Sequence, residues 1–377
     1  MRGRIIDTAG ALHYILENRH NGIPHRLGYR TGGGAHFRST THHTFGDVVK
    51  VLFSGIQPTG ELHIGNYFGA IQNWVNIQSD YETYISVVDL HSITVGYDVR
   101  EMPERIMEMV LHLYACGIDF ERTHLFVQSE VPGHADLTWI FNTITPLGEL
   151  ERMTQFKDKA KQNRQNINVG LLDYPVLQAA DILIYKGEVV PVGEDQVQHI
   201  EFTREVARRF NTRYGDVFPE CQALLTRAPR IMGLDGETKM SKSRGNTIGI
   251  MESRESIWKK LAPAKTDPAR VRRSDPGNPD KCNVFSYHLL VTPEEELGEI
   301  REGCTTAGIG CVDCKKKLLE NLMAVLDPIR QRYEVLATKK KEVRERLDVN
   351  GGHCRKVAAE TMLEVKERMG LERLWTI

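Results

Sequence analysis

Residues 48–66 have the sequence VVKVLFSGIQPTGELHIGN, which combines a short apolar run, a glycine-rich turn and the start of a helix. The β-branched run over 48–55 ends in glycine and is typical of a buried strand. A helix is predicted from about Ile64 to Ile77, because its apolar residues recur with a period of 3.6. Such a strand–turn–helix unit brings backbone N–H groups and the positive end of a helix to one place, which suits a bound phosphate.

The segments that follow alternate between strand and helix. Strands are predicted at 83–89 and 125–128, and a long helix at 104–115. Alternation at this spacing indicates parallel βαβ units, so we expect an α/β fold with a Rossmann-like, nucleotide-binding parallel sheet. Ligands of such sheets bind beyond the carboxyl ends of the strands. The side chains expected at those ends are Ser54, Gly55, His63, Asp89, His91 and Gln128.

The chain divides into three parts by its patterns. Residues 1–46 are rich in Arg and poor in acids, and we expect a disordered leader that is either transit-like or the product of a miscalled start. A catalytic Rossmann-like domain is predicted over 47–248. From there the pattern is helical and strongly charged, which predicts an all-helical domain over 249–377, with its last helix packed back on the catalytic domain.

Composition excludes several classes of protein. A chain of 377 residues is long enough for two domains, and its formal net charge of −1 provides no general attraction for nucleic acid, so RNA contacts must come from local patches. No apolar stretch reaches the roughly 20 residues of a membrane span, so we expect no membrane contact. The seven cysteines are an odd number, which favours intracellular thiols, some of them metal-bound, over a secreted disulfide framework.

A second phosphate-handling motif lies about 175 residues after the His63 turn. His63 can donate to a phosphate oxygen and Asn66 can support the nucleotide, although the turn alone is equally well explained as a tight turn with a surface histidine. In the sequence KMSKS, Lys239 and Lys242 place two mobile ammonium groups on a flexible stretch, where they can follow departing pyrophosphate. Together the two motifs predict a catalyst that activates an acid with ATP.

These motifs resemble the HIGH and KMSKS motifs of the class I aminoacyl-tRNA synthetases. Four further blocks, at 53–60, 148–157, 174–183 and 190–196, resemble the bacterial-type tryptophanyl-tRNA synthetases, and the likeness extends from about Val48 to the C-terminus. The resemblance implies that tryptophan attacks the α-phosphate of ATP, accompanied by Mg²⁺, to give tryptophanyl-adenylate and pyrophosphate. It further implies transfer of the tryptophanyl group to tRNA(Trp), and a homodimer.

The resemblance implies an ATP site that spans both motifs. The expected catalytic residues are His63, Asn66, Lys239, Lys242 and Lys159, which act by positioning and by stabilising charge at phosphorus, without a covalent enzyme intermediate. The expected ATP contacts are Gln57, Gly65, Asn66, Gly193, Glu194, Asp195, Ile231, Lys239, Met240, Ser241, Lys242 and Ser243.

The resemblance makes Asp181 the specificity residue, with a carboxylate that accepts the indole N–H. From the residues alone, helix capping is the simpler explanation of this aspartate. The other expected tryptophan contacts are Phe53, Gly55, His91, Tyr174, Gln178, Val190, Val192 and Gln196.

Four cysteines, Cys282, Cys304, Cys311 and Cys314, have the spacing C-x21-C-x6-C-x2-C. Four thiolates suit tetrahedral zinc or a [4Fe-4S] cluster. The block over 302–314 resembles the subset of bacterial tryptophanyl-tRNA synthetases that hold a [4Fe-4S] cluster near the anticodon site, although the first spacing is one residue shorter here. The resemblance implies that cluster, while structural Zn²⁺ and free thiols remain as alternatives.

The same subset favours a cytoplasmic protein, with the mitochondrial matrix as the alternative if the leader is a transit peptide. Arg270, Arg272 and Arg273 are expected to contact tRNA phosphates. Alternative enzymes are a tyrosine-specific relative and an adenylyl transferase, and a non-catalytic RNA-binding protein is the alternative from another class. The intact motif residues argue against the last, since a protein without catalysis has no physical need of them.

Overall fold

The computed structural model describes residues 49–157, 167–225 and 231–371. Internal contacts divide the chain into two units, 1–47 and 48–377, and every described element belongs to the second. The predicted leader and Lys159 lie outside the described residues.

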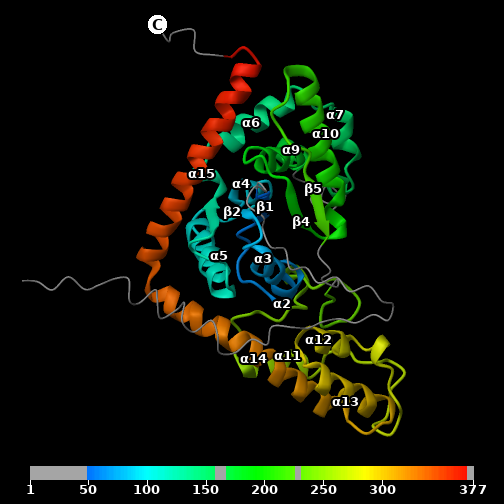
Figure 1. The fold of residues 1–377 in the computed structure, drawn as a ribbon. Coiled ribbons are helices and arrows are strands. Elements are labelled where there is room, and N and C mark those ends of the chain that lie inside the picture. Colours follow the sequence, from blue (N-terminus) through cyan, green and yellow to red (C-terminus); the bar gives the residue numbers. More distant parts are fainter. Residues whose placement is uncertain (1–48, 158–166, 226–230, 372–377) are drawn as a thin grey trace, which may run out of the picture. The chain divides into compact units, whose positions relative to one another are not determined.

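Five parallel strands form one sheet in the order β3-β2-β1-β4-β5 (Figure 1). The strands are β1 (Val51–Ile56), β2 (Glu82–Val87), β3 (Thr123–Val127), β4 (Val189–Val192) and β5 (Gln222–Leu225). This order is that of a doubly wound nucleotide-binding sheet, so the predicted α/β, Rossmann-like class is confirmed. In such sheets the ligand crevice lies where the strand order reverses, here beyond the carboxyl ends of β1 and β4.

Helices connect the strands and predominate in the described chain from Arg254 onward. In the sheet region these are α4 (Asp89–Ser92), α5 (Met102–Cys116), α6 (Gly133–Asn142), α7 (Leu147–Arg152), α9 (Val169–Leu183) and α10 (Val197–Tyr214). After the sheet come α11 (Arg254–Leu261), α12 (Asn283–Val291), α13 (Glu294–Thr305), α14 (Cys311–Thr338) and α15 (Lys340–Arg368), which confirms the helical pattern predicted for this region.

The helix predicted over 64–77 is not continuous. The short α2 (Ile64–Asn66) leads into a π-helical turn, Tyr67–Ile71, before α3 (Gln72–Ile77) begins. The backbone N–H of Gln72 donates to the carbonyl of Tyr67, five residues earlier, which widens the helix at this point. Apolar spacing does not predict this insertion, because the wide turn adds only one residue to an otherwise regular pattern.

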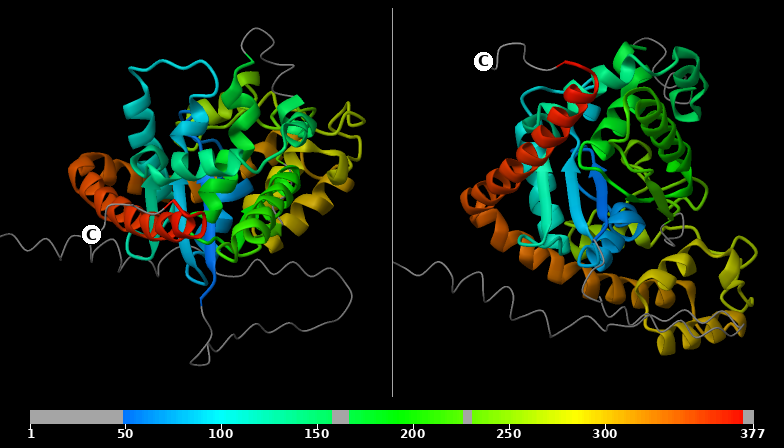
Figure 2. Two further views of the ribbon diagram at one scale, coloured as in Figure 1. Left: turned by 90° about the horizontal axis from the view of Figure 1, so that it is seen from above. Right: turned by 45° about the horizontal axis from the view of Figure 1, so that its top comes forward.

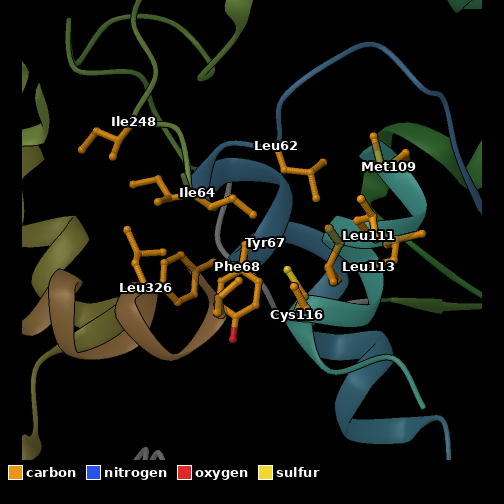
Figure 3. Close-up of a cluster of buried hydrophobic side chains, with 14 of the residues drawn as sticks. Leu62, Ile64, Tyr67, Phe68, Met109, Leu111, Leu113, Cys116, Ile248 and Leu326 are labelled. Atoms are coloured by element: carbon orange, nitrogen blue, oxygen red, sulfur yellow. The ribbon is translucent and has the colours of Figure 1, made fainter. Parts of the chain in front are cut away.

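Two hydrophobic clusters fill the opposite faces of the sheet. Ile85 and Leu125 belong to the first cluster and their neighbours Tyr84 and Phe126 to the second, since successive side chains of a strand point to opposite faces. Figure 3 shows in the first cluster Leu62, Ile64, Tyr67, Phe68, Met109, Leu111, Leu113, Cys116, Ile248 and Leu326. The residues on either side of His63 are therefore anchored in the core, which fixes the turn.

The two last helices pack on the sheet region. α14 contacts α5, and α15 contacts β3 and α6. Arg332 donates through Nε to the carbonyl of Ala115 at 2.6 Å, and Arg346 donates through Nε to that of Phe120 at 2.7 Å. Figure 2 shows α15 running beside the sheet, where it covers the edge strand β3. Among the described helices, none has both the length and the apolar composition of a membrane span.

Candidate active site

The turn after β1 is built around His63. The backbone N–H of His63 donates to Asn66 Oδ1 at 3.1 Å, so the two outer residues of the motif hold each other. A Cβ on Gly65 would lie 2.8 Å from His63 Nδ1 and 3.4 Å from the Cβ of Met240. Only glycine fits this position, because the imidazole and the second motif both lie against its backbone.

His63 is neutral near pH 7. Burial, and to a smaller extent the charges of Lys242 and Lys239, lower the pKa of His63 to about 4. A neutral imidazole still carries one N–H, so it can donate a hydrogen bond to a phosphate oxygen without losing a proton.

The structure places the KMSKS segment beside this turn. The backbone of Ile64 donates to the carbonyl of Ile248 at 2.9 Å, and Ile250 donates to that of Leu62 at 3.0 Å. Lys242 Nζ then reaches back to the carbonyl of Thr59 at 2.9 Å. The two motifs thus share one hydrogen-bonded surface at the carboxyl end of β1.

A buried asparagine that sequence reasoning missed shapes the KMSKS segment. Asn246 Oδ1 accepts from the backbone N–H of Ser241 at 2.8 Å, and its Nδ2 donates to Asp235 Oδ2 at 2.8 Å. The backbone N–H of Glu237 and the Asn246 amide both lower the pKa of Asp235. A Cβ on Gly233 would collide with the side chain of Asn246. The glycine was visible in the sequence, but its asparagine partner was not.

Asp181 lies inside α9 and is almost completely buried. Its Oδ1 accepts from Gln128 Nε2 at 2.7 Å and from His134 Nδ1 at 2.6 Å, and its Oδ2 accepts from His91 Nε2 at 2.8 Å. Helix capping, the alternative explanation of this residue, is therefore wrong. Burial alone would raise the pKa of Asp181, but the hydrogen bonds from His134 and His91 outweigh it and lower that pKa.

The Asp181 carboxylate keeps one acceptor position open. An ionised carboxylate has about four acceptor positions, of which three are occupied here. His134 is fixed from its other side, since the Tyr185 hydroxyl lies 2.9 Å from His134 Nε2. Gln128 was expected at this edge of the sheet because it follows β3, whereas His134 lies inside α6, where no motif marks it.

Several of the other predicted tryptophan contacts gather near Asp181. Phe53, Val190 and Val192 are buried in the second cluster, and the Phe53 ring stacks on Tyr185 at 5.9 Å between centroids. The Tyr174 hydroxyl lies 3.0 Å from His199 Nε2, and its ring lies against His91. The remaining predicted contacts are Gly55 in β1, Gln178 one turn before Asp181 on α9, and Gln196 after β4.

The predicted adenosine and ribose contacts follow β4. Gly193 leads into a 3₁₀ turn, Glu194–Gln196, in which Glu194 and Asp195 are exposed. The carbonyl of Asp195 accepts from Gln155 Nε2 at 3.0 Å. Ile231, in contrast, is buried in the first cluster and pairs its carbonyl with the backbone N–H of Met240 at 3.1 Å.

The four predicted metal ligands come together from separate elements. Cys282 precedes α12, Cys304 lies in α13, and Cys311 and Cys314 open α14. Burial raises the pKa of Cys314 to about 12, and the other three thiols raise it in the same direction. Among the described residues, the groups of metal-binding side chains with donor atoms within 4.8 Å of one another include none of these cysteines.

Basic groups surround the four cysteines. Arg270 donates through Nη1 to Cys304 Sγ at 3.9 Å and through Nη2 to the carbonyl of Ile309 at 2.8 Å. Arg273 donates to the carbonyl of Ala307 at 3.1 Å. Two of the three arginines expected to contact RNA therefore also hold the cysteine loop, while Arg272 is exposed.

Residues 49–327 match a family model described as tRNA synthetases class I (W and Y). The chain is 51% identical over 328 residues to a tryptophan–tRNA ligase of Deinococcus radiodurans, covering 86% of this chain and 99% of that protein. It is 48% identical over 325 residues to one of Thermotoga maritima, covering 85% and 99%. Its fold is similar to a tryptophanyl-tRNA synthetase of Campylobacter jejuni complexed with ADP and tryptophan, with a TM-score of 0.78, 34% identity, and coverage of 85% and 99%.

Proposed function

The chain belongs to the class I tRNA synthetases for tryptophan and tyrosine, within the tryptophan–tRNA ligases, and from this membership we propose its reaction. It activates tryptophan with ATP to give tryptophanyl-adenylate and pyrophosphate. It then transfers the tryptophanyl group to the terminal adenosine of tRNA(Trp). The observation that carries this proposal is the shared surface of the two motifs, in which Lys242 contacts the turn that holds His63.

Adenylate formation needs positioning and charge stabilisation. The tryptophan carboxylate attacks the α-phosphorus and pyrophosphate leaves, so negative charge grows on the phosphate oxygens. We assign His63 as a neutral donor to those oxygens, and Lys239 and Lys242 as the cations that follow the departing pyrophosphate. Mg²⁺ arrives with ATP as part of the substrate. The proposed ATP contacts remain Gln57, Gly65, Asn66, Gly193, Glu194, Asp195, Ile231, residues 239–243 and Lys159.

Tryptophan selection rests on Asp181 in this proposal. The indole N–H donates to the open acceptor position of the carboxylate, and a buried acceptor left without a donor strongly disfavours an amino acid that lacks this group. Phe53, Val190 and Val192 pack against the indole. The amino and carboxylate groups are assigned to His91, Tyr174, Gln178 and Gln196, with Gly55 beside them.

The four cysteines lie near one another in the fold, since the other three thiols all raise the pKa of Cys314. Four thiolates suit both tetrahedral zinc and an iron–sulfur cube, and the resemblance of the block over 302–314 favours the cube. We therefore propose a [4Fe-4S] cluster on Cys282, Cys304, Cys311 and Cys314, with structural Zn²⁺ as the alternative. When bound, the cluster would hold the α12–α14 region together.

The remaining assignments concern partners and organisation. We propose a catalytic domain over 47–248 and a helical domain over 249–377 that binds the anticodon region, with exposed Arg272 among its phosphate contacts. The active protein is proposed to be a homodimer in the cytoplasm.

Amino-acid-dependent ATP–pyrophosphate exchange tests this function. We expect exchange with tryptophan, but not with tyrosine or phenylalanine, and a loss of at least tenfold in kcat/KM for tryptophan in Asp181→Ala. This size follows from a hydrogen bond to a charged group, which contributes about 1.5–3 kcal/mol. Exchange with tyrosine alone would overturn the specificity, and no exchange with any of the three would overturn the enzymatic function.

A further inference from the structure

A second group of metal-binding side chains shares no residue with the four cysteines or with the predicted site around Asp181. Glu82 begins β2, His124 lies in β3, and His353 lies in the middle of α15. One ligand atom from each of these side chains lies within 4.8 Å of the other two. The three residues are far apart in the sequence, so only the packing of α15 against the edge of the sheet assembles them (Figure 1).

We propose that Glu82, His124 and His353 bind one divalent metal ion of the zinc type, which holds α15 against the sheet. Two imidazole nitrogens and one carboxylate oxygen are a ligand set that zinc favours, with a fourth position left for water. The rings of His124 and His353 stack at 4.1 Å between centroids.

Tyr84 supports this ligand set before an ion arrives. Its hydroxyl donates to Glu82 Oε1 at 2.8 Å and lies 3.2 Å from His353 Nε2, so it holds the carboxylate and one imidazole at the same point. Such hydrogen bonds from a second layer of residues orient metal ligands in proteins. Arg346, the nearby cation, is paired with Glu121 at 2.7 Å and does not occupy the Glu82 carboxylate.

The ion would add to contacts that already join α15 to the sheet. Asn350 Nδ2 donates to the carbonyl of Thr123 at 3.3 Å, next to His124, and Arg346 donates to the carbonyl of Phe120. An ion bound only in the folded state stabilises that state by mass action. We therefore expect Zn²⁺ both to bind and to raise the Tm.

Equilibrium dialysis against Zn²⁺, followed by metal analysis, tests the site on the full-length protein. We expect the wild type to retain one zinc ion per chain more than His353→Gln, and zinc to raise the Tm of the wild type by a few degrees more than that of the variant. Glu82→Gln, at the exposed start of β2, should lose the same ion without altering α15. Glu360→Gln, an exposed carboxylate on the same helix, is the matched control and should bind zinc like the wild type.

The cysteine site needs its own control because it can also take zinc. In Cys311→Ser, the ion assigned to Glu82, His124 and His353 should still be present. Equal zinc content in the wild type, His353→Gln and Glu82→Gln would overturn the proposal. Loss of all bound zinc in Cys311→Ser would also overturn it, because the ion would then belong to the cysteines.

Discussion

The residues that surround Asp181 set the charge and the orientation of its carboxylate. Three donors occupy most of its acceptor positions and keep it ionised although it is buried. The direction of the remaining lone pair depends on how those donors hold the carboxylate. His134 has the greatest influence, because it joins Asp181 to the Tyr185 hydroxyl and thereby to the stacked rings of the second cluster.

Replacing His134 by leucine should weaken tryptophan binding. The change removes the donor to Asp181 Oδ1, so the carboxylate loses a hydrogen bond worth about 1.5–3 kcal/mol. In ATP–pyrophosphate exchange we expect the KM for tryptophan to rise about 10–100-fold while kcat changes much less, since His134 positions another residue and does not contact phosphate. Tyr185→Phe should raise the KM by a smaller factor, because it leaves the His134–Asp181 contact in place.

Thr138→Val is the matched control for this prediction. Thr138 lies one turn after His134 on α6 and donates to its carbonyl, without a contact to Asp181. Its KM for tryptophan should equal that of the wild type. A His134→Leu enzyme with an unchanged KM would show that Asp181 is oriented by its other donors.

At the scale of elements, the KMSKS segment owes its shape to side chains within residues 231–250. The segment has little regular secondary structure, so its backbone groups must find other partners. Asn246 supplies these, through one acceptor for Ser241 and donors for Asp235 and Thr238. These hydrogen bonds give the loop a defined internal form.

Asn246→Ala should slow adenylate formation. The change removes the hydrogen bonds that join Asn246 to the Ser241 N–H and to the Asp235 carboxylate, which costs about 1–3 kcal/mol of the free energy that holds the loop in place. Lys239 and Lys242 are then positioned less firmly. We expect kcat for ATP–pyrophosphate exchange to fall at least tenfold with little change in the KM for tryptophan. Glu237→Gln, which alters only an exposed ion pair with Lys265 in the same loop, should retain kcat. An unchanged kcat in Asn246→Ala would contradict this account of the loop.

At the scale of the whole described unit, the cysteines lie where three helices that are separate in the sequence meet. They draw on the segment before α12, on α13 and on the start of α14, and His288 of α12 lies 3.3 Å from Cys314 Sγ. The thiols come together in the folded chain, so a bound cluster would stabilise the folded state directly.

Purification without oxygen should yield a brown protein with four iron and four sulfide ions per chain, as the [4Fe-4S] formula requires. Cys311→Ser should lose the colour and most of the iron and lower the Tm. Cys221→Ala, at a buried cysteine near the carbonyl of Ile200, is the control and should keep its iron. A colourless protein with one tightly bound zinc ion that Cys311→Ser loses would contradict the cluster and assign structural zinc to the cysteines.

Local patterns in the sequence were enough for the first three strands, for the helices between them and for the HIGH-like and KMSKS motifs. The alternation of strands and helices that starts at β1 and the apolar spacing within α5 depend on nearby residues, so both can be recognised without knowledge of the fold. The wide turn at Tyr67–Ile71 was the exception, since its hydrogen bond differs from that of an α-helix by one residue. The four-cysteine spacing was equally visible, because metal-binding patterns are compact along the chain.

The remaining features of the candidate sites are contacts between side chains that are far apart in the sequence, and these contacts depend on packing. His134 and Asp181 are 47 residues apart, and Tyr84 and His353 are 269 apart. A periodic pattern in the sequence does not predict which distant side chains are in contact, because a hydrogen bond between them depends on how whole helices and strands pack together. The chemical groups were therefore present in the sequence, but the donors around Asp181, the Asn246 contacts and the Glu82–His124–His353 group arise only when the helices pack against the sheet.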